Sequence, residues 1–318
     1  MYYLGIDVGG TQIKAGVVDE HGTILQRAEA PTGVGRHYSA IIADMAACCH
    51  RAMDLAGIPL SKINSLGVGI PGIADNETGT VIFCTNLGWH DVPLRQQLQR
   101  HLPLGVWIDN DATLAGYAES VAGISKGLRS SVFLTLGTGV GGGIVIDGKP
   151  WAGAHGVGSE IGHATLVADG EPCTCGKRGC VERYCSATAL IRMAAEVCTM
   201  HASCAMMQQA GGDMGRLTGR LVIDLAKAGD PLASQVFLQY AHYLALTVNS
   251  IISFLDPDMI VLGGGISNAG EFLTRAVEKE LPDILMFKTQ PYAKLALASL
   301  GNDAGIIGAA LIGKLTLN

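Results

Sequence analysis

The sequence has few charged residues (16%), few aromatic residues (5%) and no apolar run near the roughly 20 residues that a membrane helix needs. It has no cluster of Lys and Arg, and its formal net charge is −6. These absences argue against a membrane partner and against a nucleic-acid backbone as the main partner. The start of the chain leads into an expected strand, without the basic and apolar segments of a signal peptide. We therefore expect a cytoplasmic protein that acts on small molecules.

Glycine is abundant, with 43 residues in a chain of 318, and 48% of the chain is hydrophobic. This composition is typical of a compact globule with many tight turns. The chain is longer than a single hydrophobic core usually supports, so we expect two domains that face each other across a ligand-binding cleft. We place a small N-terminal domain at residues 1–120, completed by a C-terminal helix at 303–318, and a large domain at 121–302.

The apolar pattern predicts a β-meander at the N-terminus, followed by alternating strands and helices. Strands are expected at residues 2–7, 13–19, 23–28, 65–70, 106–108 and 259–262, and helices at 38–56, 111–121, 221–228, 234–254 and 304–314. After Gly127 the pattern starts again, with strands at 131–137 and 142–147 around another glycine-rich turn. The sequence thus indicates an α/β protein with two related halves. Residues 199–220 are expected to be a surface connection or a short helix.

Two glycine-rich turns each lie between two expected strands. Glycine allows positive φ there, and it lets backbone N–H groups converge on a phosphate. A simple tight hairpin is the alternative for each turn. The residues concerned are Asp7, Gly9, Gly10, Thr11, Gly137, Thr138 and Gly139.

A dinucleotide-binding Rossmann turn is a further alternative, because Gly137, Gly139 and Gly142 fit the pattern G-x-G-x-x-G. That pattern must lead from a strand into a helix, whereas residues 143–147 are expected to form a strand. The context therefore argues against a dehydrogenase. The G-x-x-x-x-G-K-[ST] pattern of P-loop enzymes is absent from the sequence.

A third turn, Gly263-Gly264-Gly265, ends an expected buried strand and opens a helix, so that an adenine ring can lie close to the backbone. Together, the three turns resemble those of the actin, Hsp70 and sugar-kinase superfamily. The resemblance implies a two-domain actin-like (ribonuclease H-like) fold with a cleft between the domains.

Two carboxylates and an amide, in the run Asp109-Asn110-Asp111, stand where a strand becomes a helix. Capping of that helix is the structural alternative, but one capping residue is enough. Phosphoryl transfer from ATP to an alcohol needs a carboxylate that accepts the hydroxyl proton. We assign this role of catalytic base to Asp111.

Three cysteines, Cys173, Cys175 and Cys180, lie within eight residues of one another. With His163 they offer three thiolates and one imidazole, the tetrahedral set that a structural zinc ion prefers. Free thiols and a redox pair are the alternatives for an isolated Cys-x-Cys. The other six cysteines are expected to be small buried apolar residues: Cys48, Cys49, Cys84, Cys185, Cys198 and Cys204.

These segments, in their order along the whole chain, resemble the ROK family of bacterial sugar kinases and sugar-responsive repressors. The motifs are Asn110-Asp111-Ala112, Leu136-Gly137-Thr138-Gly139, Glu160-Ile161-Gly162-His163 and the run from Cys173 to Glu182. The resemblance implies that Asp111 is the base and that Asn110, Glu160, His163 and Glu182 contact the sugar. Gly72 and Asn86 match further sugar-binding elements, although Asn86 also suits a plain turn, and both glutamates also suit an ordinary surface.

The function expected from this resemblance is an ATP-dependent hexose kinase that uses Mg²⁺ and carries a structural Zn²⁺. Glucose is the first choice of substrate, with allose, mannose, fructose and N-acetylhexosamines as alternatives, and a homodimer is expected. A ROK repressor is the competing class, but the phosphate strand is expected to begin at residue 4, so we expect no helix-turn-helix before it. Gln12 stands where many relatives have Lys, and Ser159 where many have Gly.

Overall fold

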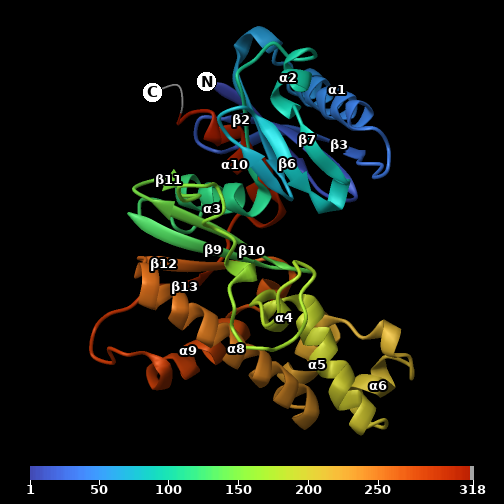
Figure 1. Ribbon diagram of the computed structural model, residues 1–318, viewed down its shortest axis with the longest axis vertical. Coiled ribbons are helices and arrows are strands. Elements are labelled where there is room, and N and C mark those ends of the chain that lie inside the picture. The colour runs from blue at the N-terminus through green and yellow to red at the C-terminus, as the bar shows by residue number, and fades with distance from the viewer. Residues whose placement is uncertain (316–318) are drawn as a thin grey trace. The chain divides into compact units, whose positions relative to one another are not determined.

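The computed structural model describes residues 1–315, which form two compact units (Figure 1). The first unit contains Met1–Phe133, Gly143–Ser159 and the segment that begins at Ser299, and the second contains Leu134–Gly142 and Glu160–Ala298. The domain boundaries expected at residues 120 and 303 stay a prediction. The last three residues of the expected C-terminal helix, 316–318, lie outside the described residues.

A five-stranded mixed sheet forms the centre of the first unit. Its strand order is β3-β2-β1-β4-β8, in which β1 runs antiparallel to β2 and parallel to β4, and β4 runs parallel to β8. The bounds are β1 Tyr2–Val8, β2 Gln12–Asp19, β3 Ile24–Pro31, β4 Ile63–Ile70 and β8 Val106–Asn110. The expected β-meander and the two later strands are confirmed.

Alternation along β1 sends side chains to two different layers. Leu4, Ile6 and Val8 join the hydrophobic core that contains helix α1, Tyr38–Ala56. Tyr3 points to the other face, where it packs with helices α3, Asp111–Val121, and α10, Ala304–Ile312. On that face a Cβ atom at Gly67 would collide with the backbone carbonyl of Ala309, so glycine permits the close approach of α10.

A smaller three-stranded sheet, with strand order β5-β6-β7, also belongs to the first unit. It contains β5 Ile73–Asp75, β6 Thr80–Cys84 and β7 Trp89–Val92, and helix α2, Leu94–Gln99, follows it. The sequence interpretation included none of these elements. Their strands are three to five residues long, which is too short for a clear alternating pattern.

The second five-stranded sheet has the order β11-β10-β9-β12-β13. Its strands are β9 Ser130–Leu136, β10 Val140–Ile146, β11 Lys149–Pro150, β12 Met259–Gly263 and β13 Lys294–Leu297. The division between the two units falls within β9 and β10. As in the first sheet, three strands consecutive in the chain are followed by two later ones, which confirms the expected restart of the pattern.

Six α-helices belong to the second unit among the described residues. They are α4 Glu182–Cys185, α5 Ala187–Met200, α6 Ala205–Gln209, α7 Gly219–Lys227, α8 Pro231–Leu255 and α9 Glu271–Ile284. Within residues 199–220, where a surface connection or short helix was expected, lie the short helix α6 and a 3₁₀ turn at Met214–Arg216. Among residues 1–315, no helix has the length and apolar character needed to cross a membrane.

A buried carboxylate near the end of α3 ties together segments that lie far apart in the sequence. Glu119 is fully buried and accepts four hydrogen bonds of 2.8–2.9 Å. The donors are the backbone N–H groups of Ile124, Ser299 and Leu300 and the hydroxyl of Ser299. Because a buried carboxylate is costly without donors, these contacts fix the start of the C-terminal segment on α3.

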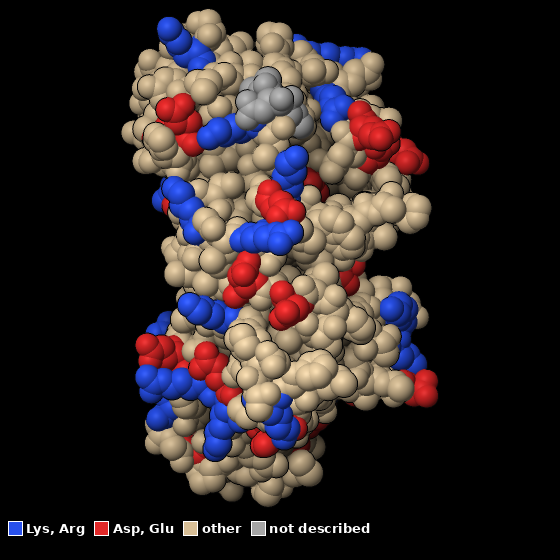
Figure 2. Space-filling view, turned by 90° about the vertical axis from the view of Figure 1, so that its left-hand side faces the viewer, with Lys and Arg blue, Asp and Glu red and all other residues tan. Residues whose placement is uncertain are grey.

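Basic and acidic side chains are interspersed on the face drawn in Figure 2. No extended basic surface is visible there among the described residues. This face therefore does not offer the stripe of Lys and Arg that a nucleic-acid backbone requires.

Candidate active site and thiol cluster

Three parallel strands of the first unit bring two acidic residues to one edge of the sheet. In the register, Asp7 on β1 lies beside Gly69 on β4, and Gly69 lies beside Asp109 on β8. Burial raises the pKa of Asp7 and of Asp109 above the usual range for a carboxyl group, while Lys14 partly opposes the rise at Asp7. The carboxyl ends of parallel strands are where ligands bind in open α/β sheets.

The side chains of Asn110 and Asp111 both accept hydrogen bonds from backbone N–H groups at the start of α3. Asn110 is the N-cap: its Oδ1 accepts from the N–H groups of Ala112 at 2.9 Å and Thr113 at 3.2 Å. Its Nδ2 donates to the Gly72 carbonyl at 3.2 Å, which holds the β4–β5 turn against α3. Asp111 occupies the first helical position, where its Oδ1 accepts from the Ala112 N–H at 2.8 Å and the helix dipole favours a negative charge. The helix-capping alternative thus applies to Asn110.

Gly72 lies in the turn between β4 and β5, and Asn86 lies in the turn between β6 and β7. A Cβ atom at Gly72 would collide with the backbone carbonyl of Phe83, so this turn requires glycine. Asn86 is exposed in the 3₁₀ turn Thr85–Leu87, which leads into β7. The structure therefore places both residues in turns, and their contacts with a sugar stay a prediction.

The first glycine-rich turn is a hairpin between β1 and β2. The Gly9 N–H donates to the Gln12 carbonyl at 2.8 Å, and the Thr32 hydroxyl donates to the Gly9 carbonyl at 2.7 Å. Gly10 and Thr11 are exposed, and no atom lies within 4 Å of a Cβ added at Gly10.

The second turn, Gly137 to Gly139, lies between β9 and β10. The Gly137 N–H donates to the Gly139 carbonyl at 3.0 Å, and the N–H of Val140 donates to Glu182 Oε2 at 3.1 Å. A left-handed backbone was one expected reason for glycine in the first two turns. None of their four glycines has a positive φ: Gly9, Gly10, Gly137 and Gly139. At Gly139 a Cβ atom would meet the end of the Glu182 side chain, which would have to move.

The third turn does have the left-handed backbone. Gly264 has φ +80°, and a Cβ atom there would lie 2.6 Å from the backbone nitrogen of Leu136. Gly263 ends β12, and Gly265 begins a 3₁₀ turn rather than the expected helix; α9 starts only at Glu271. Since Leu136 immediately precedes Gly137, the second and third turns lie side by side within the second unit.

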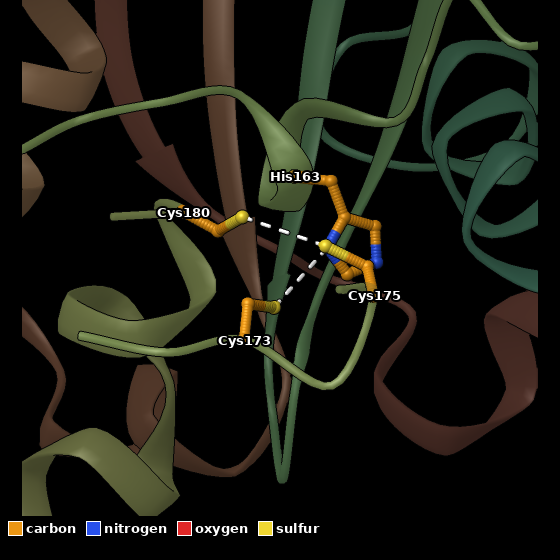
Figure 3. Close-up of side chains that lie close together, drawn as sticks. All are labelled: His163, Cys173, Cys175 and Cys180. Carbon is orange, nitrogen blue, oxygen red and sulfur yellow. Dashed lines mark hydrogen bonds between the residues drawn. The ribbon is translucent and has the colours of Figure 1, made fainter. Parts of the chain in front are cut away.

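The four expected metal ligands converge on one point, as Figure 3 shows. The possible ligand atoms of His163, Cys173, Cys175 and Cys180 all lie within 4.8 Å of one another. The two measured contacts are 3.6 Å between the sulfur atoms of Cys175 and Cys180 and 3.7 Å between Cys173 Sγ and His163 Nδ1. A tetrahedral zinc site with Zn–S bonds of about 2.3 Å places its sulfur atoms about 3.8 Å apart, so the donor set fits zinc.

The loop around this cluster has a backbone that only glycine adopts readily. Gly176 and Gly179 have φ of +87° and +72°, which allows the loop to fold Cys180 back toward Cys173. Burial and the neighbouring thiols raise the pKa of Cys180 to about 12. A metal ion must displace that proton, so binding at this site depends on pH.

The two glutamates of the motif lie in different surroundings. Glu182 begins α4, where Oε2 accepts from Val140 N–H and Oε1 lies 3.9 Å from Cys173 Sγ. It therefore links the second glycine-rich turn to the thiol cluster, a contact that the sequence interpretation did not foresee. Glu160 is exposed and immediately precedes the 3₁₀ turn Ile161–His163. Sugar contacts of both residues stay a prediction.

The sequence interpretation also missed a contact beside the second turn. The Thr188 hydroxyl donates to the Thr138 carbonyl at 2.8 Å across 50 residues of sequence. No local pattern indicates such a pairing, because it depends on how α5 packs in the folded unit.

Comparison with known proteins agrees with this two-domain actin-like α/β architecture. A glucokinase from Streptomyces griseus, solved in complex with glucose and AMPPNP, superimposes with a TM-score of 0.84 at 32% identity, over 99% of this chain and 100% of that one. A glucokinase from Halalkalibacterium halodurans is 35% identical over 96% of this chain and 93% of its own length. A xylose repressor from Caldicellulosiruptor bescii is 27% identical over 96% of this chain and 76% of its own.

The sequence model of the ROK family matches residues 3–315, which is nearly the whole chain. The protein therefore belongs to the ROK family.

Proposed function

We propose that this protein is an ATP-dependent hexose kinase that transfers the γ-phosphate to the 6-hydroxyl of glucose. The position of Asp111 carries the proposal: Asn110 supplies the capping bonds of α3, and Asp111 adds a carboxylate at the first helical position. Full-length similarity to glucokinases at about one-third identity supports the same function.

In the proposed reaction, Asp111 accepts the proton of the 6-hydroxyl as its oxygen attacks the γ-phosphorus. A new O–P bond forms, the bond to the bridging oxygen breaks, and ADP leaves. Magnesium bound with ATP would neutralise phosphate charge, and Asp7 is the carboxylate assigned to its vicinity. The zinc cluster takes no part in the chemistry.

The remaining residues of the proposal bind the ligands. Backbone groups of the first two glycine-rich turns hold the phosphates, and Gly263, Gly264 and Gly265 pack on the adenosine. The sugar is held by Gly72, Asn86, Asn110, Glu160, His163 and Glu182. The thiol cluster supports this assignment for His163 and Glu182, because it fixes one ring nitrogen of the histidine and lies beside the glutamate.

Substitution of Asp111 by Asn tests the proposal, because it removes the base and keeps the size of the side chain. We expect kcat with glucose to fall about 10²- to 10⁴-fold, the usual contribution of a general base. Sugar binding, measured by calorimetry, should be retained. Asp54→Asn, which changes an exposed carboxylate on α1, is the matched control and should behave as wild type. Undiminished turnover in the Asp111 variant would refute the assignment.

The choice of sugar is tested with a panel of hexoses in the same ATP-coupled assay. Glucose should give the highest kcat/KM among glucose, allose, mannose, fructose and the N-acetylhexosamines. A higher kcat/KM for another sugar would still support a hexose kinase but would change the proposed substrate. Sedimentation of the purified protein tests the expected homodimer.

A non-catalytic sugar sensor is the second candidate, which the similarity to a xylose repressor favours. A sensor would bind sugar without consuming ATP, and Asp111→Asn would then leave every measured property unchanged. Phosphorylation of any hexose by the wild-type protein rules this candidate out.

A further inference from the structure

Helix α5 holds two consecutive peptide groups of the second glycine-rich turn. The backbone N–H of Ala187 donates to the Gly137 carbonyl at 2.8 Å. The hydroxyl of Thr188 donates to the Thr138 carbonyl, also at 2.8 Å. The first two residues of the helix thus fix the direction of two successive carbonyl groups.

The direction of a carbonyl determines the direction of the next N–H. In a trans peptide the C=O and N–H groups of one plane point in opposite directions, and the described chain has no cis peptide bond. The N–H groups of Thr138 and Gly139 therefore both point away from α5. Successive N–H groups directed to one side form a concave site for an anion such as a phosphate.

The two contacts differ in how firmly they are held. The Ala187 N–H belongs to the helix backbone, which Ser186 caps by accepting from the Ala189 N–H. Thr188 is exposed, so its hydroxyl bond is not enforced by burial. The peptide group it holds joins Thr138 to Gly139, and glycine restricts rotation of that group less than any other residue. The Thr188 hydroxyl supplies the restraint that Gly139 lacks.

We infer that Thr188 is a positioning residue for ATP: its hydroxyl orients the Thr138–Gly139 peptide so that the Gly139 N–H faces the phosphates. This inference rests on the proposed function, in which the second turn binds the phosphates of ATP. Thr188 acts on the nucleotide through the turn and has no role toward the sugar. Loss of its hydroxyl should therefore weaken ATP binding selectively.

Three variants test this role. Thr188→Val keeps the shape and removes the donor, and Thr188→Ser restores the donor. Thr199→Val is the matched control, because Thr199 lies on the same helix, is exposed, and donates its hydroxyl to the Ala195 carbonyl at 2.8 Å. Calorimetry with AMPPNP gives the nucleotide Kd, and steady-state kinetics give KM for ATP and for glucose separately.

Thr188→Val should raise the Kd for AMPPNP and the KM for ATP about fivefold, the factor expected for one hydrogen bond. KM for glucose and the Tm should remain at wild-type values. Thr188→Ser should lie within about twofold of wild type, as should Thr199→Val.

Several results would overturn the inference. They are unchanged AMPPNP affinity in Thr188→Val, failure of Thr188→Ser to restore it, and an equal loss of glucose and nucleotide binding. With any of these, turnover by the wild type and its collapse in Asp111→Asn would still support the kinase. If the wild type phosphorylates no hexose, the proposed function fails, and the AMPPNP affinities still decide the role of Thr188. A wild type that binds no AMPPNP would refute both.

Discussion

The two five-stranded sheets share a strand order and a glycine-rich turn between their first two strands, yet the two turns are held differently. The turn at Gly9–Gly10 is a hairpin with open space around Gly10, and buried Thr32 holds it by donating its hydroxyl to the Gly9 carbonyl and its N–H to the Thr11 carbonyl. The turn at Gly137–Gly139 is held by α5, by Glu182 and, through Leu136, by Gly264. The same topology thus supports a turn held by the residue that follows β3 in one half, and a turn held by helices and a third glycine-rich turn in the other.

This difference indicates that the two halves have different roles. The first half places its acidic residues, Asp7, Asp109 and Asp111, at strand ends and a helix start. The second half surrounds its turn with side-chain contacts that continue, through Glu182, to the thiol cluster. We therefore expect changes in the second half to act on local order and ligand affinity, and changes at the acids of the first half to act on turnover.

The largest expected effect on stability comes from the thiol cluster, which belongs to the second unit alone. Cys173→Ser should lower the Tm by more than about 10 °C, because a structural zinc site contributes on the order of 10 kcal/mol to folding. Metal analysis should find about one zinc per wild-type chain and much less in the variant.

Hydrogen exchange makes this test more specific, because it measures the exchange rates of amides in each unit separately. In Cys173→Ser, amides of residues 160–185 should exchange much faster, while those of β1 and β4 keep their wild-type rates. Equal acceleration in both units would contradict the separation described above. Freshly purified wild-type protein without zinc would contradict the metal site itself.

A pair of adjacent glycines gives the next largest effect. Gly264→Ala should cost about 3 kcal/mol of unfolding free energy, because Gly264 combines φ +80° with contact against Leu136. Gly265→Ala meets no atom within 4 Å and should stay within about 0.5 kcal/mol of wild type. Urea unfolding measures both, and similar values for the two variants would show that the third turn is not braced.

A smaller effect, which depends on pH, is expected at Asp7 in the absence of ligands. Burial raises the pKa of Asp7 in the folded state above its value in the unfolded state. The contribution of Asp7 to the free energy of unfolding is therefore complete below the unfolded-state pKa and is lost as the pH rises through the folded-state pKa. Asp7→Asn should therefore have a higher Tm than wild type at pH 7, and the difference should shrink as the pH approaches about 4. A lower Tm of the variant at pH 7 would contradict this sign.

The smallest effect is expected from an exposed ion pair in the first half. Arg27 lies 2.7 Å from Asp303, and about half of each side chain is exposed. Such pairs contribute at most about 1 kcal/mol, and often less. Arg27→Gln should shift the Tm by less than about 2 °C, as differential scanning calorimetry would measure. A larger shift would mean that surface charge, rather than packing, holds the start of α10 in place.

Local patterns in the sequence predicted much of the fold. The bounds of α1 agree with the expected 38–56, because its apolar spacing is regular over the whole helix. The position of Asp111 at the start of α3 follows from the strand-to-helix change in the pattern. The thiol cluster follows from the short spacing of its cysteines, which limits how far apart they can lie.

Long-range contacts could not be predicted in this way. Thr188 meets Thr138, and Glu119 meets Ser299, only because helices pack in the folded chain. The sheet β5-β6-β7 was missed because its strands are short and partly exposed. The sequence alone also gave no sign that the Glu182 side chain lies beside Gly139.

The buried contact between Glu119 and the 299–300 segment has a consequence for recombination with relatives. A chimeric gene with one crossover between these positions takes Glu119 from one parent and the donors of residues 299 and 300 from the other. Ser299 supplies two of the four hydrogen bonds, one through its side chain, so a parent without a hydroxyl at that position leaves the carboxylate short of a donor. Exchanges that keep residues 119 and 299 from the same parent avoid this loss, whether by a single crossover outside this interval or by a double crossover within it.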